Sequence, residues 1–148
     1  MFTNILVALD GSEASQRALI RAVDEAKAWN AKVQATYVVE TTLFSLLSTE
    51  TAFETGNTVE IMYRILEKEG EAVLERAKKY CADQGIVIIT HVKQGHAGIE
   101  IISLAEQEKS DLIVVGSHGK SNIDRLLIGS VSSFVVTHSK ITTMVVRK

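Results

Sequence analysis

Residues 116–130 form a glycine- and serine-containing stretch with the composition of a phosphate-binding loop. It opens with Gly116-Ser117-His118-Gly119 and closes with Gly129-Ser130, followed by Val131. Glycine adopts positive φ readily and leaves room for a ligand, and successive N–H groups in such a turn form an anion-binding concavity. Gly129 and Ser130 stand where a helix is predicted to begin, so free N–H groups and the helix dipole would favour a phosphate there. His118, inside the loop, is placed to contact a phosphate or a ribose.

The same residues also have a purely structural interpretation. Gly116 can simply end a strand, Gly129 can permit a tight helix entry, and His118 can face solvent. Asp10 weighs against that interpretation, because a carboxylate at the exit of a buried strand suits a ribose hydroxyl, an adenine edge or a metal-bound water. Asp10 can instead cap its own turn. The residues therefore predict a phosphate site and leave local capping open.

Apolar and β-branched runs predict five strands, and apolar residues at helical spacing predict the helices between them. The strands fall at residues 5–9, 33–39, 86–92, 112–115 and 143–146. Ser12 and Glu13 predict the start of the first helix, which continues to Trp29. The later helices are marked by Met62, Leu66, Val73, Ala77 and Cys81 before Gly85, by Ile99, Ile102 and Ala105 up to Lys109, and by residues 131–138. Residues 41–58 are polar and threonine-rich. This composition fits two alternatives, a segment with a helical turn or a mobile lid.

Regular alternation of strand and helix predicts an α/β protein, a single domain over residues 1–148. We expect an open five-stranded parallel sheet in the order 3-2-1-4-5 with helices on both faces. In that order the first and fourth strands are neighbours, and ligands bind beyond their carboxyl ends at the switch point. Asp10 and the loop from Gly116 would then face each other.

Other nucleotide motifs and catalytic groupings are absent from the sequence. The chain has neither G-x-x-x-x-G-K-[ST] nor a G-x-G-x-x-G after the first strand, which disfavours a P-loop ATPase and a dinucleotide-binding domain. No general base, arginine finger or set of metal carboxylates stands out for phosphoryl transfer. The residues favour a nucleotide binder with little or slow hydrolysis.

Composition limits the partners further. The 148 residues carry a formal net charge of −2 with basic residues spread along the chain, so we expect no nucleic-acid partner. Cys81 is the only cysteine, which excludes an intramolecular disulfide, and its position in an apolar stripe indicates core filling. We see no signal peptide and no apolar stretch long enough to span a membrane, so we expect a cytoplasmic protein that does not enter membranes.

The spacing Gly116-x2-Gly119-x9-Gly129-Ser130-Val131 resembles that of the universal stress protein family. The opening Ile5-Leu6-Val7-Ala8-Leu9-Asp10-Gly11-Ser12 and the closing Met144-Val145-Val146-Arg147 extend the resemblance to essentially the whole chain. It implies the Rossmann-like fold of the adenine nucleotide alpha hydrolase type and, in the ATP-binding branch, a site for ribose and phosphates at Gly116, Gly119, Gly129, Ser130 and Val131. Ala8, Asp10, Val38 and Val115 correspond to the remaining positions, with Val38 at the adenine.

The resemblance implies an ATP-binding stress-response module, with Mg²⁺ or Mn²⁺ held through the phosphates. A slow ATPase or autophosphorylating enzyme, or an interaction module independent of nucleotide, remain alternatives. The chain departs from the family at Ala97-Gly98 and Lys140-Ile141, where prolines are frequent, which affects loop rigidity more than ligand binding. Residues 142–147 form an apolar edge strand without proline, and relatives commonly pair through it. We therefore expect a homodimer through this strand.

Overall fold

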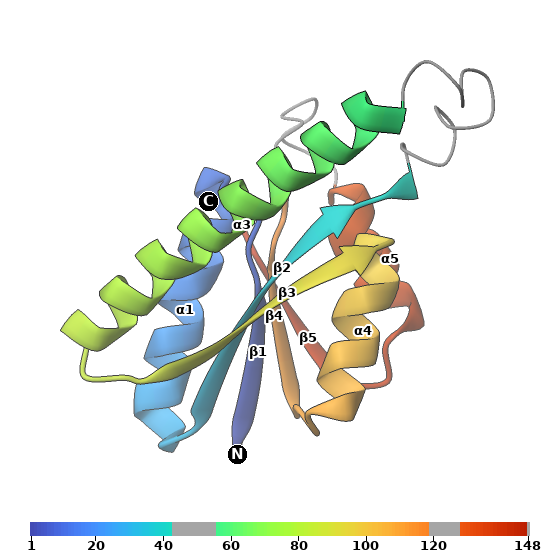
Figure 1. The fold of residues 1–148 in the computed structure, drawn as a ribbon. Coiled ribbons are helices and arrows are strands. Elements are labelled where there is room, and N and C mark those ends of the chain that lie inside the picture. The colour runs from blue at the N-terminus through green and yellow to red at the C-terminus, as the bar shows by residue number, and fades with distance from the viewer. Residues whose placement is uncertain (43–55, 119–127, 148) are drawn as a thin grey trace.

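The computed structural model describes residues 1–42, 56–118 and 128–147. Its centre is one parallel sheet in the order β3-β2-β1-β4-β5 (Figure 1). The strands are β1 (Asn4–Ala8), β2 (Lys32–Glu40), β3 (Ile88–Gly95), β4 (Leu112–Gly116) and β5 (Thr142–Val146). Strand order and orientation are confirmed as predicted.

Helices cover both faces of the sheet, again as predicted (Figure 1). They are α1 (Glu13–Trp29), α3 (Gly56–Asp83), α4 (Ala97–Gln107) and α5 (Ser130–His138). The larger core cluster joins one face of the sheet to α1 and α3, and the smaller cluster joins the other face to α4 and α5. None of the helices in the described ranges combines the length and apolar character needed to cross a membrane.

The start of α1 follows directly from its sequence. Ser12 is the N-cap, and its hydroxyl oxygen accepts a hydrogen bond from the Ser15 backbone N–H at 3.1 Å. The helix ends at Asn30, whose left-handed conformation (φ 54°) allows its N–H to bond the Ala26 carbonyl. The predicted bounds of this helix are confirmed.

The predicted bounds and the predicted burial of side chains were less accurate in β3, α3 and α4. β3 begins at Ile88 rather than residue 86 and runs on to Gly95, because β2 offers partners as far as Glu40. Val87, predicted inside the strand, is 93% exposed. Met62 and Ile99 were predicted on buried stripes, yet both side chains lie on the surface. Most of the predicted 41–58 connection, residues 43–55, lies outside the described residues.

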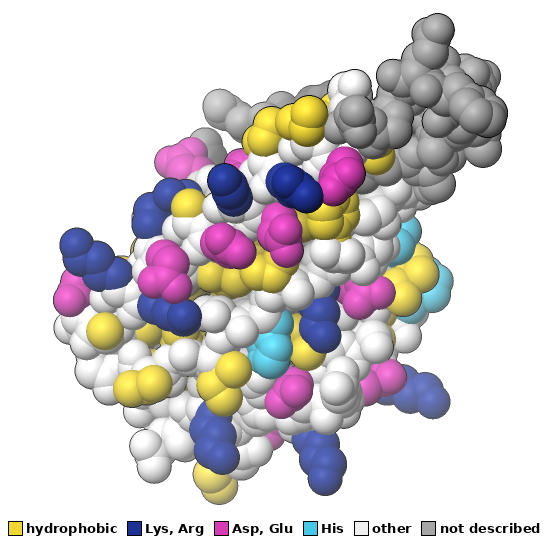
Figure 2. Space-filling view, in the orientation of Figure 1, with side chains coloured by type: hydrophobic (Ala, Val, Ile, Leu, Met, Phe, Trp, Pro, Cys, Tyr) yellow, Lys and Arg dark blue, Asp and Glu magenta, His cyan; other side chains and the backbone are white. Residues whose placement is uncertain are grey.

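Cys81 fills the core, as predicted. Its side chain is fully buried, and burial raises the pKa of the thiol to about 11. On the outer surface of α3, acidic and basic side chains alternate (Figure 2), including the ion pair of Arg64 with Glu60 at 2.8 Å. Such exposed pairs contribute little to stability.

Candidate functional site

The carboxyl ends of β1 and β4 emerge together at one edge of the sheet. These strands are parallel neighbours, with Val7 opposite Val114. Gly116, at the end of β4, lies so close to the first turn of α1 that an added Cβ would sit 2.7 Å from the Ala14 carbonyl carbon. The turn after β1 and the loop after β4 are therefore side by side, as the predicted strand order required.

Glycine at position 116 is needed for a reason that the sequence analysis did not give. Among the described glycines, positive φ occurs at Gly11, Gly85 and Gly95, but not at Gly116 or at Gly129, whose φ is −61°. The freedom of glycine to adopt positive φ is thus not used at position 116. A side chain is excluded there by the backbone of α1, not by the local backbone conformation.

Asp10 caps its own turn through one carboxylate oxygen. Oδ1 accepts a hydrogen bond from the Ser12 N–H at 2.9 Å, and the Asp10 N–H donates to the Ser15 hydroxyl at 3.3 Å. This is the local role that the sequence left open. The second oxygen, Oδ2, makes no hydrogen bond within the part of the chain that the structure describes, so Asp10 retains one acceptor at this edge.

Ser117 ties three elements together at the end of β4. Its N–H donates to the Val146 carbonyl of β5 at 2.9 Å, and its carbonyl accepts from the Gly129 N–H at 2.6 Å. Its buried hydroxyl lies 2.9 Å from His118 Nδ1. Ser117 was assigned to the loop from its place in the sequence, but no positioning role was predicted for it. Its place directly after Gly116, the last residue of β4, was the available signal for that role.

No side-chain cap for the N-terminus of α5 comes from the residues that the structure describes. Gly129 occupies the N-cap, and the first turn of the helix contains no acidic residue. The Ser132 hydroxyl donates a hydrogen bond to the Gly129 carbonyl at 3.0 Å. This contact uses the hydroxyl as a donor and gives no acceptor to the first-turn N–H groups. Ser130 and Val131 are exposed. The first N–H groups of a helix have no intrahelical partner, and among residues 1–42, 56–118 and 128–147 no side chain occupies this end, which suits an anion.

Two apolar residues near the carboxyl ends of β1 and β2 lie on the α4–α5 side of the sheet. Ala8 and Val38 are partly buried and pack against the smaller core cluster, to which Val115 belongs. Val115 is 3% exposed, so its side chain is core, while Ala8 and Val38 keep some accessible surface. Gly119 and the rest of residues 119–127 lie outside the described residues.

The N-terminus of α4 is closed by two side chains that the sequence analysis did not select for this role. Glu40 Oε2, at the end of β2, accepts from the Ala97 N–H at 2.9 Å, and His96 Nδ1 accepts from the Ile99 N–H at 3.2 Å. Burial opposes ionisation of Glu40, but hydrogen bonds from Thr42 and Ala97 outweigh it. Together with the nearby His96 they hold the pKa of the Glu40 carboxyl below its ordinary value.

A row of aromatic rings joins α4 to α5. The Phe134 ring lies 4.7 Å from the His96 ring and is stacked on His138 at 4.1 Å, measured between centroids. Gly98 leaves space for it, since a Cβ there would come within 2.3 Å of the Phe134 ring. The middle of α5 is therefore packed against the closed start of α4.

The parallel sheet and its switch point between β1 and β4 define a doubly wound α/β protein. The model of the universal stress protein family matches residues 1–147. Universal stress protein MJ0531 of Methanocaldococcus jannaschii is 34% identical over 148 residues, covering 100% of this chain and 84% of the relative. The chain belongs to the universal stress protein family.

Solved structures agree with this assignment. Universal stress protein UspA from Lactobacillus plantarum is similar with a TM-score of 0.86 and 26% identity, over 98% of this chain and 97% of that one. A universal stress protein solved in complex with cAMP is similar with a TM-score of 0.70 and 27% identity, over 98% of this chain and 97% of that one.

Proposed function

We propose that this chain binds an adenine nucleotide, and ATP in particular, at the carboxyl edge of β1 and β4. The observation that carries the proposal is the uncapped N-terminus of α5 beside the end of β4. Phosphate oxygens would accept from its first-turn N–H groups, where the helix dipole favours negative charge. The cAMP complex of the 27% identical relative supports an adenine nucleotide as the ligand class.

The proposed site contains ten residues. They are Ala8, Asp10, Val38, Val115, Gly116, His118, Gly119, Gly129, Ser130 and Val131. In this arrangement the base would lie at the accessible surface of Ala8 and Val38, and the free oxygen of Asp10 would accept from a ribose hydroxyl. Mg²⁺ or Mn²⁺ would enter through the phosphate oxygens, because the described residues form no group of three or more metal-ligating side chains.

We expect binding with little or slow hydrolysis. Ser117 and His118 form a close pair, but the serine hydroxyl is buried and serves to position the loop. A second candidate, a slow ATPase or autophosphorylating enzyme, would show phosphate release or protein labelling in a single turnover with Mg-ATP. A purely nucleotide-independent interaction module would show neither binding nor a thermal shift.

Gly129 offers a matched pair of variants for this proposal. Its extended backbone (φ −61°, ψ 161°) accepts any residue, so Gly129→Asp and Gly129→Asn should both cap α5 and raise stability by a few tenths of a kcal/mol. Only Asp adds a negative charge where the phosphates would bind. We expect Gly129→Asp to bind Mg-ATP roughly tenfold or more weakly than Gly129→Asn, by calorimetry. Equal affinities of the two variants would remove the α5 N-terminus from the mechanism.

We also propose that two copies pair through β5. This strand stands at the end of the sheet order, its backbone has β4 on one side, and its side chains from Thr143 to Val146 are partly exposed. An apolar edge strand favours pairing with another chain. Light scattering across a dilution series should give a dimer mass at micromolar concentration, and a monomer mass throughout would contradict the pairing.

A further inference from the structure

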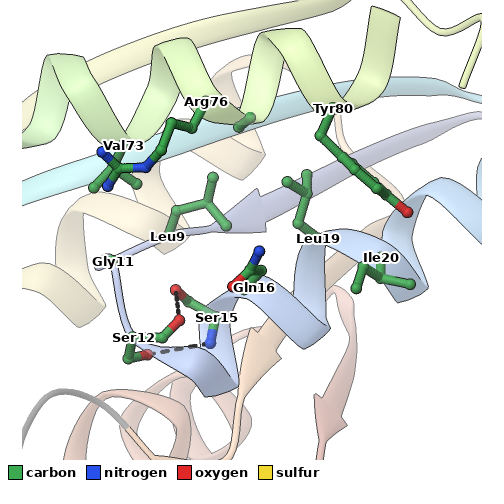
Figure 3. Close-up of a pocket in the computed structure, with 11 residues that line it drawn as sticks. Leu9, Gly11, Ser12, Ser15, Gln16, Leu19, Ile20, Val73, Arg76 and Tyr80 are labelled. Atoms are coloured by element: carbon green, nitrogen blue, oxygen red, sulfur yellow. Dashed lines mark hydrogen bonds between the residues drawn. The ribbon is translucent and has the colours of Figure 1, made fainter. Parts of the chain in front are cut away.

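A cavity of about 120 Å³ lies between α1 and α3, on the opposite side of the sheet from α4 and α5 (Figure 3). Its walls come from the turn after β1 and from facing positions of the two helices. The lining residues are Leu9, Gly11, Ser12, Ser15, Gln16, Leu19, Ile20, Val73, Arg76, Ala77 and Tyr80. The cavity shares the Gly11–Ser12 turn with the carboxyl edge but none of the residues of β4 or α5.

The inner wall of this cavity is apolar. Leu9, Leu19, Val73 and Ala77 all belong to the larger core cluster, and each is less than a tenth exposed. Figure 3 shows the Leu9 and Leu19 side chains directed into the space below α3. An apolar group that entered would be removed from water against this wall, which favours binding in proportion to the area covered.

The rim carries two polar groups with no partner. Neither Arg76 nor the Gln16 side chain makes a hydrogen bond or ion pair with another described residue, and Figure 3 shows the Gln16 amide in the space between the helices. By contrast, Arg64 and Lys78 on the same helix pair with Glu60 and Glu75.

Arg76 gives the rim its charge. No acidic residue lines the cavity. Burial, with smaller effects of Asp24 and Cys81, raises the pKa of Tyr80, so this lining phenol stays neutral. The cavity therefore presents an apolar wall and one positive charge.

We propose that the α1–α3 cavity is a second ligand site, which takes a small monocarboxylate with a short apolar chain. A guanidinium binds a carboxylate through two parallel hydrogen bonds, and the Gln16 amide can donate a further one. The chain length follows from the volume: a cavity of about 150 Å³ holds benzene, so the smaller cavity here would hold roughly five carbons with the carboxylate at the rim. This site is distinct from the nucleotide site proposed above, since it shares only the Gly11–Ser12 turn with that edge and its helix walls lie on the other face of the sheet.

Hexanoate is the probe, with hexanol as its uncharged counterpart and acetate as its short-chain counterpart. In a ¹H–¹⁵N titration of the nucleotide-free full chain, hexanoate should bind with a roughly millimolar dissociation constant and shift the amides of Gly11, Ser15 and Tyr80. Arg76→Met keeps the apolar stem of an exposed helix residue and should weaken hexanoate binding roughly tenfold. Arg64→Met, on the same helix but outside the cavity, should leave it unchanged.

The comparison of ligands decides the outcome. Hexanol and acetate should each bind more weakly than hexanoate to the wild type, and Arg76→Met should remove the advantage of hexanoate over hexanol. Three results would overturn the proposal: no saturable shift with hexanoate, equal binding of hexanoate and hexanol to the wild type, or equal losses in Arg76→Met and Arg64→Met. Because both substitutions replace exposed arginines, the test does not depend on altering the core.

Discussion

The helices α4 and α5 begin at the same edge of the sheet, but their N-termini differ in side-chain capping. The start of α4 receives a carboxylate from β2, Glu40, and an imidazole from its own N-cap, His96. The start of α5 has a glycine N-cap and no acidic residue in its first turn. Each helix N-terminus has backbone N–H groups that need acceptors. In α4 two side chains supply them, whereas no described side chain supplies one to the start of α5.

The difference shows that a helix N-terminus near a switch point is not by itself a binding site. What matters is whether a side chain already occupies it. The Glu40 carboxylate neutralises the positive end of the α4 dipole, so a second anion there would meet like charge. The phosphate proposal therefore draws on the lack of such a group at α5 within the described part of the chain, which sharpens the general rule for parallel sheets.

The largest effect that we expect at this pair of helices comes from their packing. In Gly98→Ala, the new Cβ would lie 2.3 Å from the Phe134 ring. Overpacking costs ~1–3 kcal/mol and should exceed the ~1 kcal/mol that alanine gains over glycine in a helix. We predict a net loss in the free energy of unfolding, measured with urea. A net gain would mean that Phe134 moves aside freely and that α5 is not tightly packed against the start of α4.

A double-mutant cycle assigns the cause of that loss. In the Phe134→Ala background the ring is absent, so Gly98→Ala should become stabilising through helix propensity alone. If Gly98→Ala remained equally destabilising without the ring, the contact between α4 and α5 would not be its cause.

Local sequence signals predicted the parts of the fold that depend on neighbouring residues. The apolar runs predicted the five strands, and Ser12 predicted the start of α1. The strand order was an expectation for an open parallel sheet with helices on both faces, and it is confirmed. The bounds of β3 were wrong because strand pairing, not the apolar run 86–89, decides where β3 begins and ends. Val87 is β-branched yet exposed, since no partner residue of β2 lies opposite it.

The contacts at the carboxyl edge of the sheet could not be predicted from the sequence, because they join residues that are far apart along the chain. Glu40 and Ala97 are 57 residues apart, so no local pattern could predict that this carboxylate caps α4. The requirement for glycine at position 116 likewise comes from Ala14, which only the folded sheet brings near. The loop from Gly116 and the α5 start could be proposed from spacing, but whether α5 was capped could not.

The smallest expected effect tests the closed N-terminus of α4 through pH. The Glu40 pKa in the folded protein lies below its ordinary value of 4.5. Its carboxylate therefore contributes stability that is fully present above about pH 4.5 and is lost as the pH falls through the lower folded pKa. We expect Glu40→Gln to unfold with ~1 kcal/mol less free energy at neutral pH, because the amide oxygen is a weaker acceptor for the Ala97 N–H. That difference should close at acid pH, measured by urea unfolding between neutral pH and pH 3.

The control for this prediction is Glu106→Gln, an exposed position on α4. It should show only a small difference from the wild type throughout the pH range. Curves for wild type and Glu40→Gln that stay parallel over the whole range would mean that the carboxylate charge does not close α4, and the contrast with α5 would then rest on packing alone.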